Sequence, residues 1–155
     1  MTVPERKYTL DTNLFISGLR DPDKNAALIQ FHAAFAPFEY LNAVVVQELR
    51  SGIQPGRNLR ILEKHILEPF IRRDRLIAPS FAAWKQSGDV LRELARREGL
   101  VLRGVSKSFG NDILLAVSCR EAGVTLVTDN LGDFQRISRI FPFQFLGPWP
   151  TRSDK

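Results

Sequence analysis

The first acidic residue in a position suited to chemistry is Asp11. It follows Lys7-Tyr8-Thr9-Leu10, a short β-prone stretch, and it precedes Thr12 and Asn13. A carboxylate at the carboxyl end of the first strand of an α/β sheet lies where such folds bind their ligands. The triplet Asp-Thr-Asn is also ordinary turn and cap chemistry, so Asp11 alone does not distinguish a site from a turn.

A second triplet of the same kind follows the predicted strand 124–128. Asp129 and Asn130 come directly after Thr128, and Asp133 follows in the first turn of a predicted helix. All strands of a parallel sheet end at the same edge, so Asp11 and Asp129 are predicted to lie on one edge. The second triplet makes a plain turn a weaker explanation of the first.

Two predicted helices each have a carboxylate on an otherwise apolar face. Asp112 is predicted to begin a helix over residues 111–123, in line with Leu115, and Glu48 lies beside Val45 and Leu49 in a predicted helix over residues 43–52. The helix dipole favours an acidic residue in a first turn, so a capping or surface role stays open for each. An unpaired carboxylate on a buried face is costly, which favours a site.

Several carboxylates gathered on one edge repel one another unless cations compensate them. Hard divalent ions take oxygen ligands of this type, and Mg²⁺ is typically held by only one or two carboxylates plus waters. Other chemistries lack their residues. There is no phosphate-binding glycine loop and no Gly-x-Ser-x-Gly motif, His32 and His65 fall on predicted inward helix faces, and Cys119 is the single cysteine.

The composition is that of one globular domain that tolerates a polyanionic partner. The chain has 155 residues, 44% of them hydrophobic, a net charge of +5 and a pI near 9.8. No apolar run is long enough to span a bilayer, and the first residues lack the apolar core of a signal peptide, so we expect a cytoplasmic protein.

Strands and helices are predicted to alternate along the chain, which indicates a central parallel sheet flanked by helices in three layers. A helix from about Asn58 is predicted to end near Pro69. The helix after Ser80 is predicted to have an inward face made of Phe81, Trp84, Gly88, Leu91, Leu94 and Ala95. We expect one domain over residues 1–147 and a flexible tail over residues 148–155. The predicted strands span residues 7–10, 38–42, 76–78, 124–128 and 143–146.

Four ordered motifs together resemble those of PIN-domain ribonucleases. They are Leu10-Asp11-Thr12-Asn13, Val46-Gln47-Glu48-Leu49, Asn111-Asp112-Ile113-Leu114-Leu115-Ala116, and Leu126-Val127-Thr128-Asp129-Asn130 with Asp133-Phe134. Size and motif wording are most similar to VapC toxins of bacterial toxin–antitoxin pairs. The resemblance covers nearly the whole chain.

The resemblance implies a Rossmann-like PIN fold and cleavage of RNA, such as tRNA or rRNA, that depends on Mg²⁺ or Mn²⁺. It also implies a homodimer and a VapB-like antitoxin, with operator DNA reached only through that antitoxin. By position, Asp11, Glu48 and Asp112 match the three central acidic residues. The fourth position is open among Asp129, Asn130 and Asp133, and we favour Asp129.

Under this interpretation the carboxylates hold one or two metal ions, and neighbouring polar groups position water or phosphate oxygens. These supporting residues are Thr12, Asn13, Thr128, Asn130 and Asp133. Arg50, Arg57, Arg103 and Lys107 are candidates for contacting RNA, with plain solvated surface as the alternative for each.

Two other functions stay open. A receiver-type signalling domain is also a small α/β protein with an acidic Mg²⁺ site, but neither strand 76–78 nor strand 143–146 has the phospho-accepting Asp or the Lys that it needs. A PIN fold that only binds RNA or a partner protein is the second alternative, and the full set of carboxylates argues against it.

Overall fold

A sheet of five parallel strands lies at the centre of the protein, whose computed structural model describes residues 6–151. The strand order is β3-β2-β1-β4-β5. In the middle of the sheet, Thr9 of β1 lies opposite Tyr40 of β2 and Leu126 of β4. β1 and β4 are buried along their whole length, as strands covered by helices on both faces must be. The predicted α/β fold with a central parallel sheet is therefore confirmed.

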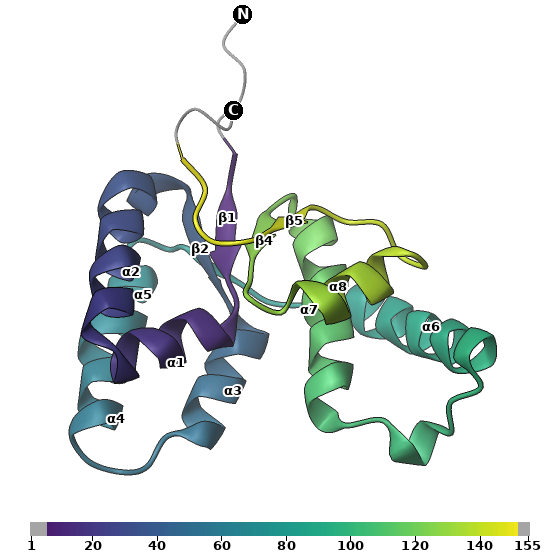
Figure 1. The fold of residues 1–155 in the computed structure, drawn as a ribbon. Helices are drawn as coiled ribbons and strands as arrows, with labels where there is room; N and C mark the ends of the chain where they lie inside the picture. The colour runs from purple at the N-terminus through teal and green to yellow at the C-terminus, as the bar shows by residue number, and fades with distance from the viewer. Residues whose placement is uncertain (1–5, 152–155) are drawn as a thin grey trace, which may run out of the picture.

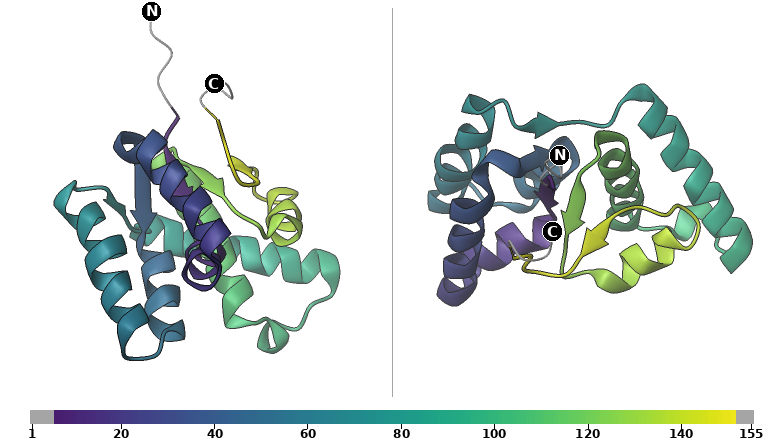
Figure 2. Two further views of the ribbon diagram at one scale, coloured as in Figure 1. Left: turned by 60° about the vertical axis from the view of Figure 1, so that its left-hand side comes forward. Right: turned by 90° about the horizontal axis from the view of Figure 1, so that it is seen from above.

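Helices cover the sheet on both sides. Figure 1 shows α1, α2, α4 and α5 to one side and α6, α7 and α8 to the other, and the view from above in Figure 2 shows the same two layers. The strands are β1 (Tyr8–Leu10), β2 (Glu39–Asn42), β3 (Leu76–Ile77), β4 (Thr125–Val127) and β5 (Phe145–Leu146). The helices are α1 (Thr12–Arg20), α2 (Pro22–Phe35), α3 (Ala43–Gly52), α4 (Arg57–Ile61), α5 (Glu68–Arg72), α6 (Phe81–Glu98), α7 (Lys107–Ala122) and α8 (Leu131–Ser138), with 3₁₀ turns η1 (Ala36–Phe38) and η3 (Leu102–Gly104).

Helices α1 and α2 form a hairpin that holds the start of α1 against the sheet. Gly18 lies at their contact, where a Cβ atom would come within 2.9 Å of Cδ2 of the buried Leu28. Asp21 ends α1 and caps α2, because its carboxylate accepts from the backbone N–H groups of Asp23 and Lys24. The close packing of the two helices thus holds α1 in place, and Asp11 is the residue that precedes its first turn.

Pro69 does not end the helix that precedes it, contrary to the prediction. α4, the π-helical segment η2 (Leu62–Leu67) and α5 form one continuous helix, with Pro69 near the start of α5. The wider hydrogen-bond spacing of a π segment accommodates a residue that cannot donate a backbone hydrogen bond. His65, predicted to face inward, is exposed instead, because the π segment changes the phase of the helix.

The predicted inward face of α6 is wrong in its first half, whereas Leu94 is buried as predicted. Phe81 and Trp84 are 83% and 60% exposed, and Gly88 is exposed as well. The buried side chains of α6 are Ala83, Val90 and Leu94. Ser80 caps this helix as predicted, with its hydroxyl accepting from the Ala83 N–H at 3.1 Å. The apolar periodicity of this stretch therefore contains two overlapping faces, and the larger residues occupy the outer one.

His32 packs into the core as predicted, and it has a charged partner there. Its ring stacks on Phe15 and meets the edge of Phe70. Its Nδ1 lies 2.5 Å from Oε1 of Glu39, which is buried at the amino end of β2. The second carboxylate oxygen of Glu39 has no hydrogen-bond partner among residues 6–151. His32 thus gives the buried Glu39 side chain a hydrogen-bond partner within the apolar layer that covers the sheet.

The last described residues lie against α2. The Trp149 ring is 5.3 Å from that of Phe31, and Pro150 is buried. The predicted tail beginning at Pro148 stays a prediction, and residues 1–5 and 152–155 lie outside the described part of the chain. Between residues 6 and 151, no helix has the length and apolar character needed to cross a membrane.

Candidate active site

Asp11 is held at the end of β1 by three donors. The Thr12 N–H donates to Oδ1 at 2.8 Å, so Asp11 is the N-cap of α1. The Thr128 hydroxyl donates to Oδ2 at 2.7 Å, and the Asn13 amide donates to the same oxygen at 3.3 Å. Thr128 follows β4, the strand beside β1. The two predicted triplets therefore meet between β1 and β4, where the strand order changes direction and α/β folds bind their ligands.

Glu48 reaches the same edge from α3. The Thr12 hydroxyl donates to its Oε1 at 2.8 Å. The phase of α3 is set by Asn42, whose side chain accepts from the Val44 N–H at 2.9 Å as the N-cap. The Asn42 amide also donates to Ser118 of α7 at 2.9 Å, which ties α3 to α7. Sequence reasoning missed Asn42, although Asn before an apolar helix is a recognisable cap signal.

Asp112 is buried on α7, but it does not begin that helix as predicted. α7 begins at Lys107 and is capped by Ser106, whose hydroxyl accepts from the Phe109 N–H at 3.0 Å. Asp112 therefore lies in the second turn, where the backbone amides are already bonded within the helix. A capping role does not explain it.

Asn130 links two further carboxylates. Its amide donates to Asp112 at 3.4 Å and to Asp133 at 3.1 Å, and its own N–H donates to the Thr128 hydroxyl at 2.9 Å. Asp129 is exposed, and its side chain makes no hydrogen bond with residues 6–151, although its charge acts on Asp11. The contacts thus single out Asp133 as the carboxylate connected to Asp112, and the part of Asp129 stays a prediction.

The carboxylates act on one another electrostatically. Burial, followed by the charges of Asp11, Glu48 and Asp133, raises the pKa of Asp112 to about 8. Burial raises the pKa of Asp11 too, against the lowering effect of the hydrogen bonds from Thr128 and Thr12. Without a cation, this edge of the sheet therefore retains at least one proton at neutral pH.

The donor chemistry fits a hard divalent cation. All the side-chain ligands available here are carboxylate, hydroxyl or amide oxygens, which such ions prefer. The amide oxygen of Asn13 is buried and has no hydrogen-bond partner among residues 6–151. No group of three or more His, Cys, Asp or Glu side chains in that range is close enough to form a metal cluster by itself. The fit therefore rests on the donor set and on the repulsion between the carboxylates.

The predicted basic contacts lie on both sides of the carboxylates. Figure 1 shows the α3–α4 loop and the η3 turn at separate lower corners, beyond the carboxyl edge of the sheet. Arg50, on the α3 side, is ion-paired with Glu63. Arg57 on that side, and Arg103 and Lys107 on the other, are exposed and form no ion pair with residues 6–151.

Comparison with known proteins gives structural matches only. No family model matches the chain, and no curated protein matches its sequence. A chain of the DNA-bound VapBC complex of Salmonella typhimurium is 22% identical, with a TM-score of 0.67 over 92% of this chain and 98% of that one.

Two further complexes match in the same way. A chain of FitAcB from Neisseria gonorrhoeae is 22% identical, with a TM-score of 0.66 over 93% of this chain and 99% of that one. A chain of VapBC2 from Rickettsia felis, bound to a promoter DNA fragment, is also 22% identical, with a TM-score of 0.59 over 92% and 98% of the two chains. At this identity the likeness establishes the fold: the chain has the PIN-like fold of VapC structures, as predicted.

Proposed function

We propose that this protein is a VapC-type toxin, an endoribonuclease that depends on Mg²⁺ or Mn²⁺. The observation that supports the proposal is the group of carboxylates at the carboxyl edge of the sheet. Asp11, Glu48, Asp112 and Asp133 come from four separate elements, and burial together with the charges of the other three carboxylates raises the pKa of Asp112 to about 8. Such repulsion costs stability, so a function that needs these charges together explains it better than the fold does.

Asp11 and Asp112 would hold the cation, with Glu48 and either Asp129 or Asp133 acting directly or through water. A divalent ion bound there would activate water and offset the charge that develops on the scissile phosphate. The protein's own contribution is orientation. Thr128 and Thr12 fix the two oxygens of Asp11, and Thr12 also fixes Glu48. Asn130 restrains Asp112.

The partners follow from the same proposal. The matched structures are toxin–antitoxin complexes named VapBC and FitAB, some of them bound to DNA. We extend this to a VapB-like antitoxin that neutralises the protein and mediates any contact with operator DNA. RNA is the substrate, and a homodimer is the proposed assembly.

The Asp11→Asn variant tests the nuclease. An amide at this position still caps α1 and can accept from the Thr12 N–H, so the fold should persist while the charge is lost. We expect RNA cleavage with Mg²⁺ to fall by at least about a hundredfold, since several kcal/mol of transition-state stabilisation depend on the site. The measurement is cleavage of labelled tRNA and rRNA fragments, with and without EDTA.

Asp89→Asn is the matched control, because Asp89 lies on the exposed face of α6 and pairs with Arg92 of the same helix. It should cleave like the parent. Asp129→Asn and Asp133→Asn, compared side by side, identify the fourth carboxylate. Expression of the parent should arrest bacterial growth and expression of Asp11→Asn should not. Parent cleavage that continues in EDTA, or an Asp11→Asn variant as active as the parent, would contradict the proposal.

A further inference from the structure

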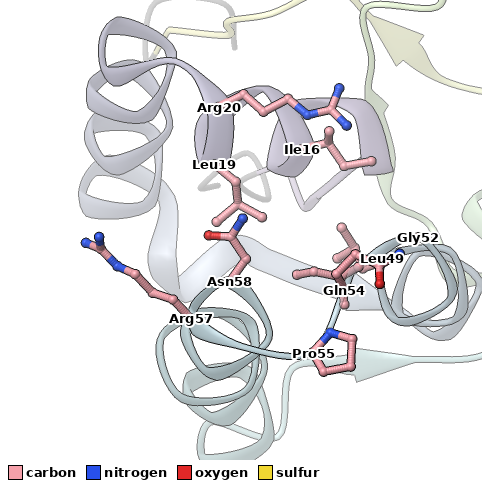
Figure 3. A pocket seen from close by; sticks show the side chains of 10 residues that line it. Ile16, Leu19, Arg20, Leu49, Gly52, Gln54, Pro55, Arg57 and Asn58 are labelled. Carbon is pink, nitrogen blue, oxygen red and sulfur yellow. The ribbon is translucent and has the colours of Figure 1, made fainter.

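A cavity of about 370 Å³ opens between α1, α3 and the start of α4. Its apolar walls include Ile16 and Leu19 of α1 and Leu49 of α3. Figure 3 shows Leu19 and the amide of Asn58 pointing toward one another from opposite helices at one side of it. This volume is in the range of pockets that hold small organic groups.

The cavity lies near the carboxylates, because α1 and α3 contribute residues to both. Thr12, at the start of α1, donates a hydrogen bond to Glu48 of α3. Ile16 lies about 6 Å further along the axis of α1 than Thr12, because a helix rises 1.5 Å per residue. Leu49 directly follows Glu48 in α3. The cavity therefore begins within about one helical turn of Thr12 on α1 and of Glu48 on α3.

The charged groups around the cavity are all cationic. No carboxylate lines it, whereas Arg20 and Arg57 both do. Neither arginine has an ion-pair partner among residues 6–151, in contrast to Arg50, which is paired with Glu63. Two unpaired guanidinium groups beside apolar walls complement a ligand that is anionic outside and apolar in its faces. A nucleotide has this combination: a phosphate and a planar base.

We propose that this cavity binds an unpaired base of the RNA beside the cleavage site, an inference that rests on the proposed nuclease function. Leu19 and Leu49 contact the faces of the base, and Arg20 and Arg57 contact the adjoining phosphates. The amides of Gln54 and Asn58, which also line the cavity, have both donors and acceptors for the edge of a base. The cavity thereby gives the enzyme a preference for one base near the cut.

Gly52 is a position at the cavity where a side chain can be added without a clash and without removing an existing side chain. It lines the cavity, and a Cβ atom at this position would meet nothing within 4 Å. Gly88 is equally open, but it lies on the exposed face of α6. Gly52→Phe and Gly88→Phe are thus the same substitution inside and outside the proposed site.

The first test measures binding without cleavage. Both substitutions are placed in the Asp11→Asn protein, and the affinity for a short, fluorescein-labelled, single-stranded RNA of random sequence is measured by anisotropy in EDTA. Gly52→Phe should weaken binding by about tenfold, the loss typical of one stacked base. Gly88→Phe should bind like its parent. Thermal unfolding of each variant checks that it is folded.

The second test measures base preference. Gln54→Ala and Asn58→Ala change exposed side chains, so folding should not be affected. The active parent and each variant cleave a randomised RNA pool, and the cut ends are sequenced. The parent should prefer one base at a fixed position beside the cut, and the variants should lose that preference with less change in overall rate.

The outcomes separate the two proposals. If the parent cleaves RNA but Gly52→Phe binds as tightly and the variants keep the parent's base preference, the cavity proposal is wrong and the nuclease proposal stands. If these substitutions leave RNA binding intact and instead weaken binding of a purified antitoxin, the cavity is a protein-docking site and the proposal is also wrong. If the parent neither binds nor cleaves RNA, the nuclease function itself fails.

Discussion

Asp112→Asn is expected to stabilise the metal-free protein while abolishing the proposed RNA cleavage. At pH 8 the gain in the free energy of unfolding should be on the order of 5–6 kcal/mol, because the folded-state pKa of Asp112 is about 8 instead of 3.8 and each unit corresponds to about 1.4 kcal/mol. For a domain of this size such a gain raises Tm by roughly 15 °C. An amide at this position still accepts the hydrogen bond that Asn130 donates.

The same shift fixes how stability depends on pH. Between about pH 4 and pH 8, the folded protein keeps a proton on Asp112 that the unfolded chain has released. The free energy of unfolding therefore falls as pH rises through this window, by up to about 1.4 kcal/mol per unit from this group. The favourable contribution is complete below pH 4 and is lost near pH 8. In Asp112→Asn, this part of the slope should disappear.

Urea unfolding in EDTA, repeated across that pH window, measures the effect. Asp89→Asn serves as the control, because this exposed carboxylate should leave the parent's slope unchanged. Adding Mg²⁺ should stabilise the parent by mass action and should stabilise Asp112→Asn much less. An Asp112→Asn protein with the parent's stability and slope would show that burial and the neighbouring carboxylates do not raise the pKa of Asp112.

The second large effect concerns His32 and Glu39. Glu39 is the first residue of β2 and lies away from the carboxyl edge of the sheet. His32→Phe keeps a ring against Phe15 and Phe70 but leaves the buried Glu39 without a partner. We expect a loss of about 3–5 kcal/mol in the free energy of unfolding, the cost of breaking a buried pair from one side. Chemical denaturation measures it, and the exposed His65→Phe is the matched control.

The double variant His32→Phe/Glu39→Met should recover most of this loss. Replacing both members of a buried polar pair with apolar groups of similar volume is often neutral or stabilising. Together with the parent and the single variants His32→Phe and Glu39→Met, the double variant completes a double-mutant cycle that isolates the coupling between the two residues. Equal stability of His32→Phe and the parent would mean that Glu39 does not need its partner.

The strands and their parallel arrangement could be predicted from the sequence, but not the bounds and buried face of every helix. β1 and β4 are apolar and β-prone, and both end on small polar residues, so their ends and the approach of Asp11 to Thr128 were predictable. α3 was correctly identified as a helix despite its three valines, because Val44, Val45 and Leu49 share one face only in a helix.

The errors arose where tertiary packing overrode the local pattern. In α6, both Trp84 and Val90 fit an apolar face, and only the position of α7 decides that Val90 is buried. In α7, the Ser106 cap places the start of the helix at Lys107, four residues ahead of Asn111, the start predicted from sequence, although a Ser cap is a recognisable signal. For the fourth carboxylate, the position of Asn130 favours Asp133, and nothing in the sequence shows how that amide is directed.

The hydrogen bond that Thr128 donates to Asp11 joins residues that are 117 positions apart in the sequence. During synthesis, Asp11 leaves the ribosome early, but the strand that orients its carboxylate is among the last to emerge. The carboxylates therefore assemble only after β4 has paired with β1. A nascent or truncated chain that ends before β4 lacks the oriented carboxylates, so any activity that depends on them can arise only after β4 has been made.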